Sequence, residues 1–130
     1  MADVHTGGCA CGAVRYRASG PLRPVVYCHC ESCRRQTGHY VAATAAALAG
    51  FAVEGADSLG EWRATGEATR RFCRRCGSIL FWQRDGADTV SIMAGSLDLP
   101  TGLAATVHIF TAEKGDYYEI ADGLPCRLGA

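Results

Sequence analysis

Seven of the eight cysteines in this 130-residue chain fall into three short motifs, and these motifs constrain the fold more than any other feature. The motifs are Cys9-Ala10-Cys11, Cys28-His29-Cys30-Glu31-Ser32-Cys33 and Cys73-Arg74-Arg75-Cys76. Thiols at such close spacing are typical of metal ligands in a reducing compartment, whereas disulfides would need an oxidising one. The motifs predict one group of four thiols and one group of three.

The first and third motifs together supply four thiols, which we call the four-cysteine group (Cys9, Cys11, Cys73 and Cys76). Two tight turns that each present two thiolates complete a tetrahedral structural zinc site. A glycine follows each pair, Gly12 and Gly77, and permits the tight turn. The alternative is that these cysteines are small buried hydrophobes. The pattern favours metal binding and gives little indication of catalysis.

The second motif supplies the three-cysteine group (Cys28, Cys30 and Cys33). A zinc with three protein ligands keeps one coordination position open for water or substrate, and a thiolate-rich zinc suits an exchangeable sulfur ligand. His29 lies between two of these thiols and is a candidate fourth ligand, a proton relay or a residue without a role. The alternatives are a structural site closed by His29 or His39, and an iron–sulfur cluster that recruits the distant Cys126.

Length and composition predict one globular domain over residues 1–130, with a core over about residues 7–125. Thirteen basic and thirteen acidic residues cancel, so nucleic acid is not an expected partner. The one local basic cluster, Arg70 to Arg75, keeps an anionic partner as an alternative. Neither a secretory signal nor an apolar run long enough to span a membrane is evident, which predicts a cytoplasmic protein. A homodimer through an exposed strand edge is an open alternative to a monomer.

Frequent glycines and short apolar segments predict a mainly β fold. The expected strands are residues 13–18, 24–28, 69–72, 79–83, 89–94 and 106–111. Asp85-Gly86 is expected to form a hairpin turn, because this pair tolerates positive φ. The alanine-rich segment from Tyr40 to Leu48 has helical propensity, but it is short and lies among strands, so we expect a strand.

Three stretches together resemble the glutathione-dependent formaldehyde-activating enzyme family, also called the centromere-protein-V-like family. They are Gly8-Cys9-Ala-Cys11-Gly12, Cys28-His29-Cys30-Glu-Ser-Cys33-Arg-Arg-Gln-Thr-Gly38 and Arg71-Phe72-Cys73-Arg-Arg-Cys76-Gly77. The later segments Ala94-Gly95-Ser96-Leu97-Asp98, His108-Ile109-Phe110 and Ala121-Asp122-Gly123-Leu124-Pro125 are also similar to the family. The likeness runs in order from about Gly7 to Pro125.

The resemblance implies a single-domain, two-zinc fold of the Mss4-like or β-tent kind, with a structural zinc on the four-cysteine group and an open zinc on the three-cysteine group. It implies a carbon–sulfur lyase that joins a thiol such as glutathione to formaldehyde. The chain departs from the family where many members carry a Lys-Ala-Pro-Trp-like segment. Tyr117 and Tyr118 stand there instead, and a tyrosine either preserves the packing of the tryptophan or changes what binds.

The implied reaction gives roles to residues beside the three-cysteine group. His29, His39 or a water would supply a proton to the adduct. Four residues that follow Cys33 are candidates to hold the carboxylates of a glutathione-like molecule, because arginine matches carboxylate geometry: Arg34, Arg35, Gln36 and Thr37. Their alternative role is a solvated turn. For the whole chain, the alternatives to an enzyme are a non-catalytic zinc module that binds another macromolecule and a sensor of metal or thiol stress.

Overall fold

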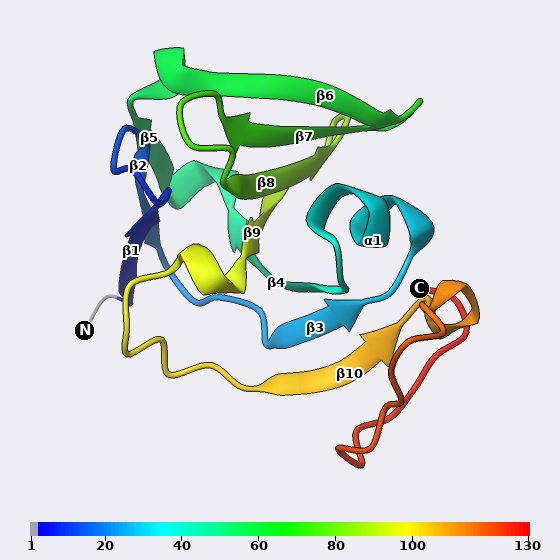
Figure 1. Ribbon diagram of the computed structural model, residues 1–130. Helices are drawn as coiled ribbons and strands as arrows, with labels where there is room; N and C mark the ends of the chain where they lie inside the picture. Colours follow the sequence, from blue (N-terminus) through cyan, green and yellow to red (C-terminus); the bar gives the residue numbers. More distant parts are fainter. Residues whose placement is uncertain (1–2) are drawn as a thin grey trace. The chain divides into compact units, whose positions relative to one another are not determined.

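A computed structural model describes residues 3–130, and this range divides into two compact units. Unit 1 comprises residues 3–23 and 44–102, and unit 2 comprises residues 24–43 and 103–130. Strands dominate the secondary structure of both units (Figure 1). The four-cysteine group belongs wholly to unit 1 and the three-cysteine group wholly to unit 2, so each group is assembled within one unit.

Unit 1 contains two antiparallel arrangements of strands among its described residues. The first has the order β1 (Val4–Gly8), β2 (Arg15–Ser19) and β5 (Phe51–Glu54). The second joins strands that follow one another in the chain: β6 (Leu59–Thr65), β7 (Ala68–Cys73), β8 (Ile79–Arg84) and β9 (Thr89–Met93). Three 3-10 turns complete the unit: η1 (Leu48–Gly50), η2 (Ala56–Ser58) and η3 (Ala94–Ser96).

Alternation along the strands builds the core of unit 1. In β2, Tyr16 and Ala18 are buried while the residues between and beside them are exposed, as expected for a strand with one face against a core. The Tyr16 ring meets the ring of Phe81 edge-on with centroids 5.2 Å apart, and Phe51 meets Phe81 in the same way at 5.2 Å. These aromatic contacts pack β2 and β5 against β8.

Unit 2 places a short helix directly after a strand. β3 (Val25–Cys28) pairs in parallel with β10 (Ala105–Ile109) and antiparallel with the first residues of β4 (Val41–Ala47), which runs on into unit 1. Helix α1 (Glu31–Thr37) follows β3, and the 3-10 turn η4 (Thr111–Glu113) follows β10. Gly38 ends α1 in the left-handed conformation with φ 86°, and its N–H donates to Arg34.

The C-terminal segment of unit 2 returns alongside β10. The backbone N–H of His108 donates to Pro125 at 2.9 Å, and the N–H of Arg127 donates to the carbonyl of His108 at 2.8 Å. His108 and Cys126 thereby form a parallel bridge. The segment around Asp122 is therefore held beside His108 by backbone hydrogen bonds.

The structure confirms the prediction of a mainly β fold. Each of the six expected strands is present within a few residues of its predicted bounds, and the alanine-rich segment is strand β4. Gly86, with φ 73°, lies in the turn between β8 and β9 as predicted. Sequence analysis predicted no helix and gave a solvated turn as the alternative for residues 34–37, whereas residues 31–37 form helix α1. Within residues 3–130, no helix combines the length and apolar character that crossing a membrane requires.

Candidate functional site

The four-cysteine group has the geometry of a closed zinc site. Its four sulfur atoms all lie within 4.8 Å of one another. The Sγ atoms of Cys9 and Cys11 are 3.7 Å apart, and those of Cys11 and Cys73 are 3.8 Å apart. A tetrahedral zinc with bonds of ~2.3 Å to sulfur separates neighbouring sulfurs by ~3.8 Å. The four residues therefore fit a structural zinc.

Backbone amides and one hydroxyl surround these sulfurs. The N–H of Val14 donates to Cys9 Sγ at 3.2 Å, and the N–H of Arg75 donates to Cys73 Sγ at 3.4 Å. Ser78 connects the two turns, because its Oγ lies 3.2 Å from Cys76 Sγ and accepts the N–H of Ala10 at 2.9 Å. Hydrogen bonds from the hydroxyl and backbone of Ser78 lower the pKa of Cys76 to about 5, which favours the thiolate that a metal requires.

Ser78→Ala should weaken zinc binding to the four-cysteine group. Loss of a partner that orients a ligand typically lowers metal affinity about 10–100-fold, and Ser78 contacts both turns of this group. Chelator competition on protein that also carries Cys30→Ser, to disable the three-cysteine group, measures this affinity. Ser19→Ala, at the exposed end of β2, is the control. Equal zinc affinity in the two serine variants would contradict the role of Ser78.

The three-cysteine group forms where β3 passes into α1. Cys28 is the last residue of β3, Cys30 is the N-cap of α1, and Cys33 is buried in the first turn of the helix. The Sγ atoms of Cys30 and Cys33 are 3.0 Å apart, and those of Cys33 and Cys28 are 3.4 Å apart. Both distances exceed the ~2.05 Å of a disulfide, and all three sulfurs lie within 4.8 Å of one another.

Crowding of these thiols favours a bound cation. Hydrogen bonds with Cys30 and Cys33, followed by burial, raise the pKa of Cys28. Three adjacent thiolates repel one another, so a metal ion is what allows them all to be deprotonated. Among the described residues, neither His29 nor His39 contributes a ligand atom to this group. The structure therefore favours three protein ligands over a site closed by a histidine. Cys126 is also outside the group, which removes the basis for the iron–sulfur alternative.

The four residues proposed to hold carboxylates all lie on α1, but their side chains differ in availability. Arg35 is exposed and pairs with Glu31 at 2.9 Å. The Thr37 hydroxyl bonds the carbonyl groups of Cys33 and His39 at the helix end. Arg34 Nε and Gln36 Oε1 are buried atoms with no hydrogen-bond partner among residues 3–130. Arg34 and Gln36 are therefore the stronger candidates to bind a ligand.

His29 is buried and not a solvated loop residue, with 1% of its surface exposed. Its Nδ1 hydrogen-bonds the hydroxyl of Tyr118, and its Nε2 lies 2.8 Å from Nδ1 of His108. His108 Nε2 in turn lies 2.8 Å from Oδ2 of Asp122. Burial, followed by electrostatic interaction with His108, His39 and Lys114, lowers the pKa of His29 to about 4. His29 is therefore neutral near pH 7.

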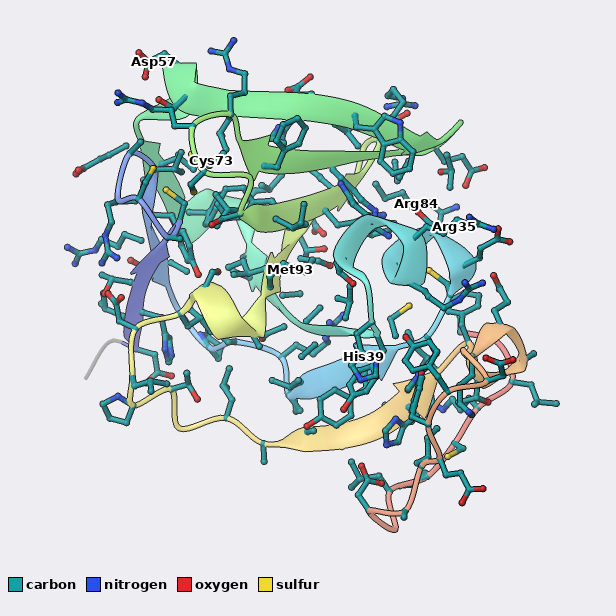
Figure 2. The ribbon with its side chains drawn as sticks, in the orientation of Figure 1. Arg35, His39, Asp57, Cys73, Arg84 and Met93 are labelled. Atoms are coloured by element: carbon teal, nitrogen blue, oxygen red, sulfur yellow. The ribbon has the colours of Figure 1, made fainter. Side chains whose placement is uncertain are left out.

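Aromatic rings surround this histidine pair within unit 2. The Tyr40 ring lies tilted against the His29 ring with centroids 4.6 Å apart, and the Tyr118 ring stacks on it at 5.6 Å. His39, labelled in Figure 2, lies beside the same rings, with its Nδ1 3.0 Å from the hydroxyl of Tyr117. Lys114 places its ammonium 4.4 Å from the centre of the Tyr118 ring.

Sequence reasoning assigned no role to His108, Tyr118 or Asp122, although all three lie in segments that carried the family resemblance or departed from it. His39 was considered as a ligand or proton donor, and it faces Tyr117 instead of the thiols. Glu31, which lies between Cys30 and Cys33 in sequence, forms an ion pair with Arg35. The partners of His29 are 79 and 89 residues away in sequence, so local pattern gave no signal for them.

Comparison with known proteins connects this geometry to one family. A family model described as glutathione-dependent formaldehyde-activating enzyme matches residues 4–113 of the chain. The chain belongs to this family. The matched range includes both cysteine groups, His29 and His108, whereas Tyr118 and Asp122 lie beyond it.

Two further relatives agree with this membership. A protein of Halomonas elongata, provisionally named a glutathione-dependent formaldehyde-activating enzyme, is 32% identical over 126 residues, which cover 88% of this chain and 79% of that protein. A crystal structure of a Rhodobacter sphaeroides protein has a TM-score of 0.60 and 28% identity, covering 78% of this chain and 99% of that one. Family membership and the two thiol groups together support an enzymatic role.

Proposed function

We propose that the protein is a zinc-dependent carbon–sulfur lyase that reversibly adds a small thiol of the glutathione class to formaldehyde or a similarly small aldehyde. The product is an S-hydroxymethyl thiol adduct. The observation that carries the proposal is the contrast between the two groups. The four-cysteine group has four sulfurs at the separations that a tetrahedral zinc requires. The three-cysteine group has only three sulfurs, and a buried histidine, His29, lies between two of its cysteines in sequence. The Mss4-like fold, the single-domain bounds and the cytoplasmic location belong to the same proposal.

The reaction is balanced without an oxidant or reductant. The S–H bond of the thiol breaks, its sulfur forms a bond to the carbonyl carbon, and the carbonyl oxygen takes a proton to become a hydroxyl. Bound by Cys28, Cys30 and Cys33, zinc would supply Lewis acidity and a fourth position suited to sulfur. Bound by the four-cysteine group, it would stabilise the fold. His29 would hold and orient a proton donor beside the reacting atoms.

Helix α1 would orient the thiol substrate. Arg34 and Gln36 each have a buried polar atom without a partner in the described structure, one turn or less beyond Cys33. A carboxylate of a glutathione-like molecule could accept hydrogen bonds from the Arg34 guanidinium, which matches its planar geometry. The same helix would thereby carry a thiol ligand of the metal and a group that recognises the remote end of the substrate.

Exchange spectroscopy tests the proposed reaction. Zinc-loaded protein is mixed with ¹³C-formaldehyde and glutathione, and magnetisation transfer between free formaldehyde and the S-hydroxymethyl adduct is measured by NMR. We expect a faster exchange rate than in the uncatalysed mixture. No acceleration with glutathione, and none with other small thiols, would overturn the proposed function and favour the non-catalytic zinc module.

Arg34→Ala should raise the KM for glutathione by about 10–100-fold, because a hydrogen bond to a charged group contributes about 1.5–3 kcal/mol. The rate with 2-mercaptoethanol, which has no carboxylate, should change little. Arg35→Ala should have a smaller effect on KM, because its guanidinium already pairs with Glu31. Arg17→Ala, on the exposed face of β2, is the control. Equal effects of Arg34→Ala on both thiols would show that Arg34 does not recognise the carboxylate.

A further inference from the structure

Four side chains of unit 2 form an unbroken hydrogen-bonded chain beside the three-cysteine group. Tyr118 bonds His29 Nδ1, His29 Nε2 bonds His108 Nδ1 at 2.8 Å, and His108 Nε2 bonds Asp122 at 2.8 Å. The exposed fractions of His29 and His108 are 1% and 2%, whereas the Asp122 side chain is 43% exposed. All four ring nitrogens of the two histidines are therefore occupied, and the hydrogen-bonded chain runs from Tyr118 to the partly exposed Asp122.

The chemistry of these groups gives the chain a direction. An ionised carboxylate only accepts hydrogen bonds, so His108 carries its proton on Nε2. In a neutral pair, His108 Nδ1 then accepts from His29 Nε2–H, and His29 Nδ1 accepts from the hydroxyl of Tyr118. Before a substrate proton enters, each donor of this hydrogen-bonded chain thus donates to the neighbour that is nearer to Asp122. The lone pairs of the Tyr118 oxygen stay available to a bound molecule.

The chain can take up one proton and keep every hydrogen bond. As Tyr118 oxygen accepts a proton, its own proton moves to His29 Nδ1, and the Nε2 proton of His29 moves to His108 Nδ1. Tyr118 and His29 end neutral, and the charge resides on His108 against the Asp122 carboxylate. The other groups facing His108 are the uncharged rings of Tyr27 and Tyr40. Asp122 is thus the only carboxylate that the described structure places against this imidazole.

Tyr118 is linked to the three-cysteine group through His29. Its hydroxyl bonds His29, which is covalently flanked by Cys28 and Cys30. Burial, followed by the neighbouring Tyr117 and Tyr40, raises the pKa of the Tyr118 hydroxyl, and the charge of Arg34, on α1, acts in the opposite direction. The raised pKa keeps this hydroxyl protonated at rest, so that it can pass its own proton to His29 as its oxygen accepts another. Tyr118 is therefore connected to the three-cysteine group through His29 and lies within electrostatic reach of the arginine proposed to hold the substrate.

We propose that Tyr118 is the acid–base residue of the reaction and that His29, His108 and Asp122 form a relay that stores the proton of the substrate thiol on His108. This proposal rests on the proposed function. In the forward direction the thiol S–H proton enters at Tyr118 as the sulfur attacks the aldehyde. The same proton equivalent then returns through Tyr118 to the alkoxide oxygen, so the net reaction consumes and releases no proton. Tyr118 is catalytic, and His108 and Asp122 are positioning residues.

Two tyrosine variants test the catalytic part. Tyr118→Phe keeps the ring but removes the hydroxyl, and it should lower kcat about 10²–10⁴-fold, the usual contribution of general acid–base catalysis. Zinc content should be unchanged. Tyr117→Phe is the matched control, because its hydroxyl bonds His39 outside the chain, and it should stay within about twofold of wild type. Equal rates for the two variants would overturn the assignment of Tyr118.

A spectroscopic test of the relay does not depend on turnover. Long-range ¹H–¹⁵N spectra of the zinc-loaded wild type should show His29 and His108 both protonated on Nε2 at neutral pH. The backbone N–H of Leu124 donates to Asp122 Oδ1 at 3.0 Å. In Asp122→Asn, this N–H should keep the amide oxygen facing Leu124. The amide N–H₂ then faces His108, and both histidines should switch to Nδ1–H.

The two kinds of result separate the two proposals. If the wild-type protein shows the expected tautomers but does not accelerate the exchange, the proposed function is overturned and the hydrogen-bonded chain itself stands. If the exchange is accelerated but His29 is protonated on Nδ1 at rest, the relay alone is overturned. The same holds if the exchange is accelerated and the histidine tautomers do not change in Asp122→Asn. If Tyr118→Phe does not fold, the presence or absence of the tautomer switch in Asp122→Asn still tests the relay.

Discussion

Cys73→Ser should leave the purified protein largely unfolded at 25 °C. Cys73 is fully buried at the end of β7, and its sulfur contacts that of Cys11, 62 positions earlier in the chain. Binding of a structural zinc contributes on the order of 10 kcal/mol to folding, which is comparable to the ~5–15 kcal/mol of a typical domain. Far-UV circular dichroism and amide chemical-shift dispersion measure the loss, and metal analysis measures the zinc.

The control for this prediction is Cys126→Ser. Cys126 is exposed and belongs to neither cysteine group, so the thermal midpoint and the zinc content of this variant should match those of wild type. A Cys73→Ser protein that folds with a nearly unchanged thermal midpoint would show that the four-cysteine group does not stabilise the fold. The adjacent turns would then be held by strand pairing alone.

The cysteine groups could be predicted because most of their information is local. Cys73 and Cys76 occupy one turn, and Gly77, with φ 79°, supplies the left-handed residue that ends it. The same holds for Cys9, Cys11 and Gly12. Once the three-cysteine group is set aside, only the pairs Cys9/Cys11 and Cys73/Cys76 remain in the motifs. These two pairs were therefore predicted to share one metal ion. The structure places all four sulfurs together as predicted.

Sequence reasoning missed β1, β5 and β6, and of these β1 and β6 lack a periodic apolar signal. β6 reads Leu-Gly-Glu-Trp-Arg-Ala-Thr, and most of its residues are exposed because the strand ends its ladder. β1 contains two glycines, which disfavour strand by propensity. Both strands form because a neighbouring strand pairs with them. Such long-range pairing outweighs local preference, so it is visible only in the folded chain.

The relay could not be predicted for a related reason. A histidine between two thiols looks like a ligand or a solvated loop residue when only its neighbours in sequence are considered. His29 is buried because β10 and the C-terminal segment lie against β3, which brings His108 and Tyr118 to its ring. The segment with Tyr117 and Tyr118 was noted in sequence only as a departure from the resemblance, and Tyr118 contributes the first group of the hydrogen-bonded chain.

Cys30→Ser should remove one of two zinc ions and abolish catalysis without unfolding the protein. Cys30 is the N-cap of α1, and its sulfur accepts the N–H of Cys33 at 3.3 Å. Serine is among the best N-cap residues, so this substitution deletes a metal ligand but preserves the helix cap. A hydroxyl is a poor ligand beside thiolates. Metal analysis should therefore give two zincs per wild-type chain and one per variant, with exchange at the uncatalysed rate.

The thermal midpoint decides how this result is interpreted. A midpoint within a few degrees of wild type, together with one lost zinc, would establish that the three-cysteine group is a separate site built for exchange and not for stability. One zinc in both proteins, with no catalysis in either, would mean that the three thiols do not hold zinc in the isolated protein. The fold would then be that of a zinc module stabilised by the four-cysteine group alone, with the three thiols left to bind a partner or respond to oxidation.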